Sequence, residues 1–477
     1  MPIHQINMHS DLNFQSHKYH LGMTDFYQSC PKHIMQSFLN SLDVYNRTAY
    51  VANQELLGVV TTILKNGGDN SVGIPATNLS WRSFIGSEKG FSTGDFRSKL
   101  AKEELSLVEG LMVALDQLND LGDREYFMPC SIDYRGRLYP MATFVSHLNN
   151  DSVRACHKFA TKKKLGPRPS ENEYSGFEWL IIHCMNCAEI LKKPTREESL
   201  EIGKKLLPCM IESARDPING AGWWKTVESP FQTLAACMEI RDALDSGDVE
   251  NFESNLPVYQ DGTCNGYQHW SAIGRDITGA IASNVCPNEE NDRPQDLYTA
   301  ILKHVVRDLN ENDNGQMHYK EALRVINRKL VKRPVMTIPY GVTKRGAHIQ
   351  VLEEVKPLIR PEYQNDVSEL ISLTTLRAVD EVFGAAMGLK GWLCEMAKCE
   401  AVYGRQMAWI SPLGLPCSQI AIDRLTRSKV ERDKLKQIDH MRQSLRYGNV
   451  RTNFKPSNIP VSTIKAHMAI GTWGYLL

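Results

Sequence analysis

Residues 328–341 read Arg328-Lys329-Leu330-Val331-Lys332-Arg333-Pro334-Val335-Met336-Thr337-Ile338-Pro339-Tyr340-Gly341. On a helix that advances about 100° per residue, Arg328 and Lys332 face the same side, and Tyr340 follows about 80° beyond Lys332. Pro339 has no backbone N–H, so we expect the helix to bend or end before Tyr340, and Gly341 to let the chain turn just after it. An arginine that can donate to two phosphate oxygens, together with a mobile lysine charge, suits a triphosphate ligand.

The charge around this stretch is locally positive. The chain carries 55 Lys and Arg and 55 Asp and Glu, yet residues 320–345 contain eight cations and one acid. A second segment, residues 423–455, contains ten cations and four acids. Both segments are basic enough to follow a phosphate backbone, although for the second a solvated helix face explains the pattern equally well.

An acidic motif lies upstream. It reads Asp261-Gly262-Thr263-Cys264-Asn265-Gly266-Tyr267-Gln268-His269 and follows the apolar segment 256–259, so we expect a short strand over residues 256–262. The Asp261 carboxylate and the Gly262 carbonyl are the kind of oxygen ligands that Mg²⁺ prefers. Without its surroundings, an Asp-Gly pair would indicate only a turn.

Composition excludes several classes of protein. With 477 residues, 42% of them hydrophobic and 23% charged, the chain is of the folded globular kind. We find no apolar run of about 18 residues, which predicts that the protein is not integral to a membrane. The first twenty residues contain no Arg and carry Asp11, which disfavours a secretory signal and a mitochondrial presequence and makes the cytoplasm the expected location.

The twelve cysteines show no disulfide framework and indicate reduced thiols. Cys184 and Cys187, preceded by His183, could begin a zinc site. No second pair with matching spacing follows, which favours buried helix thiols.

Apolar periodicity predicts an α-rich chain with a few short strands, and hence an α+β fold. Val108, Leu111, Leu115 and Leu118 have the spacing of one buried helix face. Strand and turn are expected over residues 126–139. The expected helical segments are 31–65, 96–121, 177–193, 230–244, 294–310, 320–334 and 368–403.

Three ordered blocks resemble one known family. Asp133 to Pro140 looks like the early palm motif of the single-subunit phage-type DNA-dependent RNA polymerases of bacteriophages, mitochondria and linear plasmids. Asp261 to His269 resembles their first catalytic motif, and Arg328 to Gly341, read as R-x3-K-x7-Y-G, resembles their fingers helix. Trp223 to Phe231 and Trp409 to Pro416 are similar to lesser family segments, so the resemblance covers about residues 39–419.

The resemblance implies a mostly helical right-hand polymerase with a small antiparallel palm sheet. Residues 1–125 would form an N-terminal arm and a thumb-like region. Residues 126–285 would form the palm with helical insertions, and residues 286–477 the fingers, incomplete at the C-terminal end relative to the family.

The resemblance also implies roles for five residues in nucleotidyl transfer. Asp261 would be one of two metal-binding aspartates, with the Gly262 carbonyl beside it, in a reaction that uses Mg²⁺. Arg328 and Lys332 would hold the nucleotide phosphates, and Lys332 would assist the leaving pyrophosphate. Tyr340 would lie by the ribose and the template base and favour ribonucleotides.

Arg135 and Arg137 would contact the nucleic-acid backbone, a role that less position-specific surface arginines also fill. The implied partners are a DNA template, an RNA transcript and ribonucleoside triphosphates. Related template-directed DNA polymerases share the fingers helix but place a Glu five residues after the metal aspartate. That place is Gly266 here, which has no side chain to block a ribose 2′-hydroxyl, so RNA synthesis is favoured.

Two departures from the family bear on activity. About 130 residues precede Asp133, fewer than the family's promoter-binding region needs, and the chain contains no His-Asp dipeptide for the late palm motif that supplies the second metal aspartate. The acids after Pro416 lie among cations as surface pairs would (Asp423, Glu431, Asp433 and Asp439). We therefore expect that this chain alone does not polymerise.

Two origins would account for such an incomplete enzyme. Either the gene is split and a second polypeptide supplies the late palm motif, or the chain is a truncated or interrupted product. The lack of a presequence favours a phage enzyme that acts in the host cytoplasm. A mitochondrial enzyme is less favoured by the sequence. Two different functions also fit the pattern: a non-catalytic nucleic-acid-binding subunit or remnant, and a related template-directed DNA polymerase.

Overall fold

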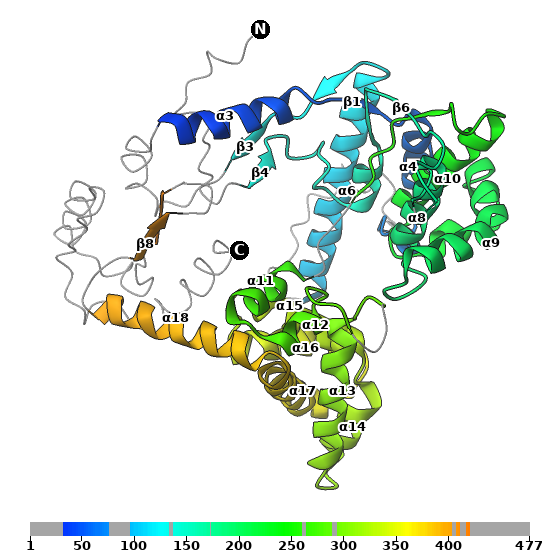
Figure 1. The fold of residues 1–477 in the computed structure, drawn as a ribbon. Coiled ribbons are helices and arrows are strands. Elements are labelled where there is room, and N and C mark those ends of the chain that lie inside the picture. The colour runs from blue at the N-terminus through cyan, green and yellow to red at the C-terminus, as the bar shows by residue number, and fades with distance from the viewer. Residues whose placement is uncertain are drawn as a thin grey trace, which may run out of the picture. The chain divides into compact units, whose positions relative to one another are not determined.

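The computed structural model describes residues 32–75, 96–132, 137–171, 173–259, 264–288, 293–402, 407–410 and 416–419. Helices dominate these residues, and the strands are short and antiparallel, which confirms the α+β expectation (Figure 1). The chain divides into two compact units. Unit 1 is built mainly from residues 40–131 and 138–260, and unit 2 mainly from residues 261–477.

Unit 1 holds a small sheet beside a helical layer. The sheet has the order β2-β1-β5, in which Tyr50 pairs with Tyr126 on one side and with Phe159 on the other. The described elements before residue 260 are, in chain order, α3 (Lys32–Asn46), β1 (Ala49–Ala52), α4 (Gln54–Lys65), η2 (Asn70–Val72), α6 (Phe96–Leu121), β2 (Tyr126–Phe127), β3 (Cys130–Ile132), β4 (Leu138–Pro140), α7 (Asp151–Ala155), β5 (His157–Phe159), β6 (Lys163–Lys164), α8 (Gly176–Ala188), α9 (Arg196–Arg215), η3 (Trp223–Thr226), α10 (Pro230–Asp245) and β7 (Glu253–Ser254).

The core of unit 1 lies among α8, α9 and α10. Gly203 allows α9 to approach α8 closely, because a Cβ there would lie 2.3 Å from Ile181 Cγ2. Trp224 and Phe231, from one of the lesser family segments, are fully buried with their ring centroids 5.4 Å apart. The predicted face of α6 is buried as well, since Leu111, Leu115 and Leu118 are each at most 4% exposed.

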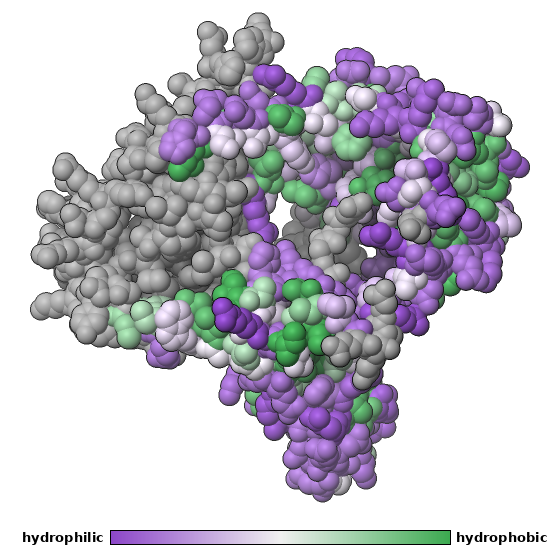
Figure 2. All heavy atoms as spheres, in the orientation of Figure 1, coloured by the Kyte–Doolittle hydropathy of each residue, from purple (hydrophilic) through white to green (hydrophobic). Residues whose placement is uncertain are grey.

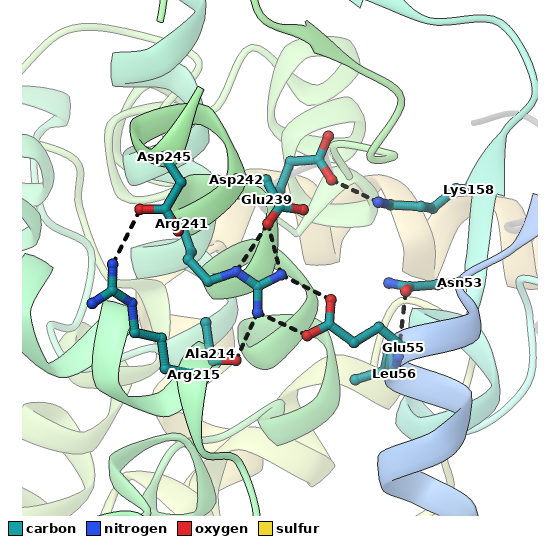
Figure 3. Close-up of polar contacts among 10 residues, drawn as sticks. All are labelled: Asn53, Glu55, Leu56, Lys158, Ala214, Arg215, Glu239, Arg241, Asp242 and Asp245. Atoms are coloured by element: carbon teal, nitrogen blue, oxygen red, sulfur yellow. Dashed lines mark hydrogen bonds and ion pairs between the residues drawn. The ribbon is translucent and has the colours of Figure 1, made fainter. Parts of the chain in front are cut away.

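Hydrogen-bonded ion pairs connect α4 to α10 of the helical layer (Figure 3). The Arg241 guanidinium donates to both carboxylate oxygens of Glu55, at 2.7 and 2.8 Å, and also to Asp242 and to the Ala214 carbonyl. The hydrogen bond from Arg241 lowers the pKa of the Glu55 carboxyl. Because Arg241 is on α10 and Glu55 is on α4, the pair joins segments that are 186 residues apart in the chain.

Two local predictions for unit 1 are wrong. The expected helix over residues 31–65 is interrupted by β1, because residues 49–52 pair with β2 and β5. The expected strand over 256–262 does not form in its described part, residues 256–259. The preceding strand β7 pairs with β6 and ends at Ser254. Asn255 then donates its side-chain amide to the Phe159 carbonyl at 2.7 Å, and Pro257 has no N–H with which to extend a ladder.

Unit 2 is a helical assembly centred on α17, which packs against α13, α14, α15 and α16. Hydrophilic residues cover the outer end of α13 and α14, and apolar residues gather over α11 and α12, where Ile273 and Ile277 are exposed (Figure 2). The described elements of unit 2 after residue 263 are α11 (Asn265–Gly274), α12 (Ile277–Ala282), α13 (Leu297–Glu311), α14 (Met317–Val325), α15 (Arg328–Thr337), α16 (Lys344–Val355), α17 (Pro361–Val382), α18 (Gly384–Val402), β8 (Met407–Ile410) and β9 (Pro416–Gln419). No described helix has both the length and the apolar character needed to cross a bilayer.

Two expected helices of unit 2 are each divided in the structure. The segment 320–334 is split at Ile326 and Asn327, and the segment 368–403 is split at Phe383. Asn327 is extended and its side-chain oxygen accepts from the backbone N–H groups of Lys329 and Leu330, at 2.9 and 3.1 Å. This cap begins α15 at Arg328, so the cationic stretch forms a separate helix.

Candidate functional site

Helix α15 presents a buried face and a half-exposed cationic side. Leu330, Val331 and Val335 are each at most 2% exposed. Arg328 and Lys332 lie one turn apart and are both partly exposed. The sequence pattern correctly placed these two cations on a common side of the helix.

The end of α15 turns as its proline and glycine predict. The N–H of Gly341 donates to the Ile338 carbonyl at 3.0 Å, and the N–H of Val342 donates to the Thr337 carbonyl at 3.1 Å. Gly341 has a φ of 82°, so this pair of bonds is the Schellman arrangement with glycine in the left-handed position. Tyr340 is the last residue before that glycine, and its side chain is 41% exposed.

Helix α11, which begins inside the acidic motif at Asn265, supports the same turn. Pro339 cannot donate to the Val335 carbonyl as a helical residue would, and the buried Tyr267 hydroxyl supplies a hydrogen bond to that oxygen at 2.9 Å. The Tyr267 ring lies 4.4 Å from the Phe383 ring, centroid to centroid. The part of the acidic motif that lies on α11 is therefore packed against the end of α15.

Gly266 lies at this contact and is buried. A Cβ placed on Gly266 would lie 3.2 Å from Pro339 Cβ, which is tighter than ordinary van der Waals contact. The close packing of α11 on Pro339 is thus one physical reason for a glycine at this position. The effect of Gly266 on sugar choice remains a prediction.

At the other end of α15, Arg328 forms an ion pair inside unit 2. Its Nε and Nη2 donate to the two oxygens of Asp296, at 2.6 and 3.2 Å, and its guanidinium lies 5.0 Å from the centroid of the Tyr298 ring. Burial alone would raise the pKa of Asp296, but hydrogen bonds from Arg328 and Thr299 outweigh burial and lower it. The Tyr298 hydroxyl lies 3.0 Å from Cys264 Sγ, so this cluster also contacts the acidic motif.

Four of the eight cations in residues 320–345, Arg328 included, are paired with acids that lie elsewhere in the sequence or on the same helical turn. Arg324 pairs with Glu321, Arg333 with Glu353, and Lys329 with Glu354. These pairs reduce the excess positive charge that residues 320–345 show in the sequence. The side chains of four cations of the segment make no hydrogen bond or ion pair with a described residue, and of these only Lys332 is half-buried (Lys320, Lys332, Lys344 and Arg345).

A family model described as DNA-dependent RNA polymerase matches residues 170–457. The chain belongs to this family. It is 30% identical over 406 residues to a mitochondrial DNA-directed RNA polymerase of Homo sapiens, a match that covers 82% of this chain and 32% of the relative. It is 33% identical to the chloroplastic DNA-directed RNA polymerase 3B of Nicotiana tabacum, with 83% of this chain and 41% of the relative covered.

DNA-directed RNA polymerase 1, mitochondrial, of Arabidopsis thaliana is 32% identical, with 82% and 41% covered. The chain therefore spans about a third to two-fifths of the length of these relatives. The resemblance inferred from three sequence blocks is confirmed at the level of the family.

In this member of the polymerase family, several predicted site residues lie outside the described part of the chain. These are Asp261, Gly262 and Arg135, together with the basic segment 423–455. Arg137 is described and exposed, just before β4. Among the described residues, no group of three or more His, Cys, Asp and Glu is arranged to hold a metal ion. Cys184 is buried, with its Sγ 3.8 Å from that of Cys237.

Three residues of this site were not predicted: Asp296, Tyr298 and Tyr267. Asp296 carries a local signal, because it precedes the helical segment as an N-cap residue and accepts from the Tyr298 N–H at 3.2 Å. Its pairing with Arg328 joins residues 32 positions apart, which no local spacing reveals. Tyr267 lies inside the acidic motif, but nothing in the sequence of that motif indicates that its hydroxyl donates to the Val335 carbonyl.

Proposed function

We propose that this chain forms the nucleotide-binding and part of the template-binding region of a DNA-directed RNA polymerase, and that α15 holds the triphosphate of the incoming ribonucleotide. The observation that carries the proposal is Lys332. It is the half-buried cation left without an acidic partner among the described residues, on a helix whose neighbouring cations are paired. A partly desolvated ammonium without a counter-ion favours an anionic ligand.

The residues around Lys332 support the same ligand. Asp296 and Tyr298 already hold the Arg328 side chain in one position. Little further conformational entropy is therefore lost when Arg328 binds a phosphate. Tyr340 is exposed at a turn held by Gly341 and Pro339, where it can contact a nucleotide sugar.

Asp261 and the Gly262 carbonyl are the proposed Mg²⁺ ligands, on the chemistry of their oxygen atoms. Bound Mg²⁺ would neutralise the charge of the phosphates that react. We propose a DNA template and an RNA transcript as partners, with Arg135 and Arg137 on the nucleic-acid backbone. The second metal-binding acid would be supplied from outside these 477 residues, on a continuation of the chain or on another polypeptide.

The names of the similar polymerases place them in mitochondria or chloroplasts. We therefore propose an organellar location, in preference to the host cytoplasm that the sequence favoured. The three-part division into a thumb-like region, palm and fingers stays part of the proposal.

The test is triphosphate binding by the full chain. We expect Lys332→Ala to weaken the affinity for GTP about tenfold, as measured by calorimetry, because it removes one charge-assisted contact. Lys329→Ala is the matched control, since Lys329 is on the same helix but is 79% exposed and paired with Glu354. It should change the affinity less than about twofold.

Equal affinities for the wild type and Lys332→Ala would reject the nucleotide-binding assignment of α15. DNA binding without any triphosphate binding would favour a non-catalytic nucleic-acid-binding subunit. A wild-type preference for deoxynucleotides would favour the related DNA polymerases.

A further inference from the structure

The last carbonyl groups of α15 need donors, and the chain provides them from three places. The Val335 carbonyl accepts from the Tyr267 hydroxyl, and the Thr337 carbonyl accepts from the N–H groups of Tyr340 and Val342. The Ile338 carbonyl accepts from the Gly341 N–H and also from Lys390 Nζ at 2.6 Å. Lys390 is therefore the one charged side chain that donates to this turn in the described part of the chain.

An ammonium group is well suited to this position. Unpaired carbonyls give the C-terminal end of a helix a partial negative charge, which a cation stabilises most when it is shielded from water. Burial lowers the pKa of Lys390, which is consistent with a group largely withdrawn from solvent. The short contact therefore joins a shielded charge to the helix end that immediately precedes Pro339 and Tyr340.

Lys390 belongs to α18, whose first half is fixed to the rest of unit 2. The N–H of Ala386 donates to the Asp276 carboxylate at 3.2 Å, and Gly274 packs against the Ala386 backbone, where an added Cβ would lie in contact at 3.4 Å. Phe383, just before α18, is fully buried against Tyr267. Lys390 thus reaches the turn from an element that is itself held in place.

We propose that Lys390 is a positioning residue for Tyr340, and through it a determinant of sugar selection. This inference rests on the proposed function, in which Tyr340 lies by the ribose. By holding the Ile338 carbonyl, Lys390 keeps the Schellman turn in one geometry and so fixes where the Tyr340 ring projects. Loss of this hydrogen bond loosens the turn and lets Tyr340 occupy several positions.

The experiment compares Lys390→Met with Lys303→Met in the full chain. Lys303 is exposed on α13, and its side chain makes no hydrogen bond or ion pair with a described residue. Its replacement is therefore a control for the loss of one lysine side chain. The first measurement is amide hydrogen exchange of Gly341 and Val342, which requires no nucleotide. Lys390→Met should raise their exchange rates about tenfold, as expected for loss of a charge-assisted hydrogen bond, while Lys303→Met leaves them unchanged.

The second measurement is the ratio of the affinities for GTP and dGTP. We expect Lys390→Met to reduce this ratio by about threefold or more, in the same direction as Tyr340→Phe, with Lys390→Arg restoring most of it. A structural role alone would lower stability without changing the ratio. If Lys390→Met proves too unstable, Lys390→Gln keeps an uncharged donor on a side chain one atom shorter and should give an intermediate ratio.

The outcomes separate this inference from the proposed function. Unchanged exchange at Gly341 and Val342 overturns the inference even if GTP binding depends on Lys332. Faster exchange with an unchanged ratio, in a chain whose Tyr340→Phe variant does change the ratio, overturns the link between Lys390 and sugar selection. A wild type that binds no triphosphate rejects the proposed function, and the exchange rates then still decide whether Lys390 holds the turn.

Discussion

Asp296 makes two stabilising interactions, a helix cap and an ion pair, whose contributions can be separated by substitution. Its carboxylate caps α13 by accepting from the Tyr298 N–H, and it also pairs with the Arg328 guanidinium through two bonds. Asp296→Asn keeps an equally good N-cap side chain but loses the negative charge and one of the two acceptors. Asp296→Ala loses both interactions. The difference in unfolding free energy between these two variants therefore measures the contribution of the cap. The loss that both variants share measures the contribution of the ion pair.

The expected magnitudes follow from the contacts. A hydrogen bond to a charged group is worth about 1.5–3 kcal/mol, and Arg328 and Asp296 are 24% and 13% exposed, so screening by water is moderate. Asp296→Asn should thus destabilise unit 2 by about 2 kcal/mol. Asp296→Ala adds the lost cap, about 1 kcal/mol, for a total of about 3 kcal/mol.

The assay is native-state hydrogen exchange of amides in α13 and α15, which reports on unit 2 without assuming that the whole chain unfolds in one step. Asp276→Asn is the control, because Asp276 caps α12 by accepting from the Gly279 N–H at 2.9 Å and its other oxygen accepts from a backbone N–H, that of Ala386. In a chain that already carries Arg328→Met, Asp296→Asn should lower the unfolding free energy of unit 2 by less than about 0.5 kcal/mol. The reasoning is refuted if Asp296→Asn destabilises equally with and without Arg328.

Two further predictions concern pH and the turn. Burial lowers the pKa of both His157 and His183 to about 4, against about 6.5 in an unfolded chain, so the folded state prefers both rings neutral. The stability they contribute is present above about pH 6.5 and is lost as the pH falls toward 4, which amounts to about 2 kcal/mol for each ring between pH 7 and pH 5. Urea unfolding of unit 1, measured between pH 7 and pH 5, should show this loss of stability. The His183→Leu variant should lose about half as much over the same range. An unchanged pH dependence in this variant would show that His183 is not one of the two groups responsible. Gly341→Ala should destabilise unit 2 by about 1–2 kcal/mol, because residue 341 has a φ of 82° that a Cβ disfavours, whereas Gly388→Ala, at a helical position with open space, should be neutral or stabilising. A thermal melt of both variants checks this, and equal melting temperatures would show that the turn relaxes without strain.

The sequence predicted those features that depend on local spacing. The bounds of α6 and the end of α15 followed from apolar periodicity, from Pro339 and from Gly341. The strand β1 was missed because four residues between two helical segments are too few to break a helical pattern, and only pairing with β2 and β5 makes them a strand.

For the candidate site, the sequence predicted the candidate ligand-binding residues but not the residues that support them. Arg328, Lys332 and Tyr340 could be named from their spacing and from the family resemblance. Their supports could not, because Asp296 is 32 residues before Arg328 and Lys390 is 52 residues after Ile338. Contacts of this range arise from the packing of α13 and α18 within unit 2, and the sequence of α15 contains no sign of them.

The contact between Gly266 and Pro339 constrains how this protein can change over generations. Residue 266 is the place where the related DNA polymerases carry a glutamate, so it is an obvious position at which sugar preference could shift. With 3.2 Å between an added Cβ and the Pro339 ring, a larger residue at 266 requires that ring to shift by a few tenths of an ångström, unless residue 339 changes as well. The two positions therefore form an epistatic pair. A substitution at 266 is therefore expected to be tolerated better when residue 339 changes with it.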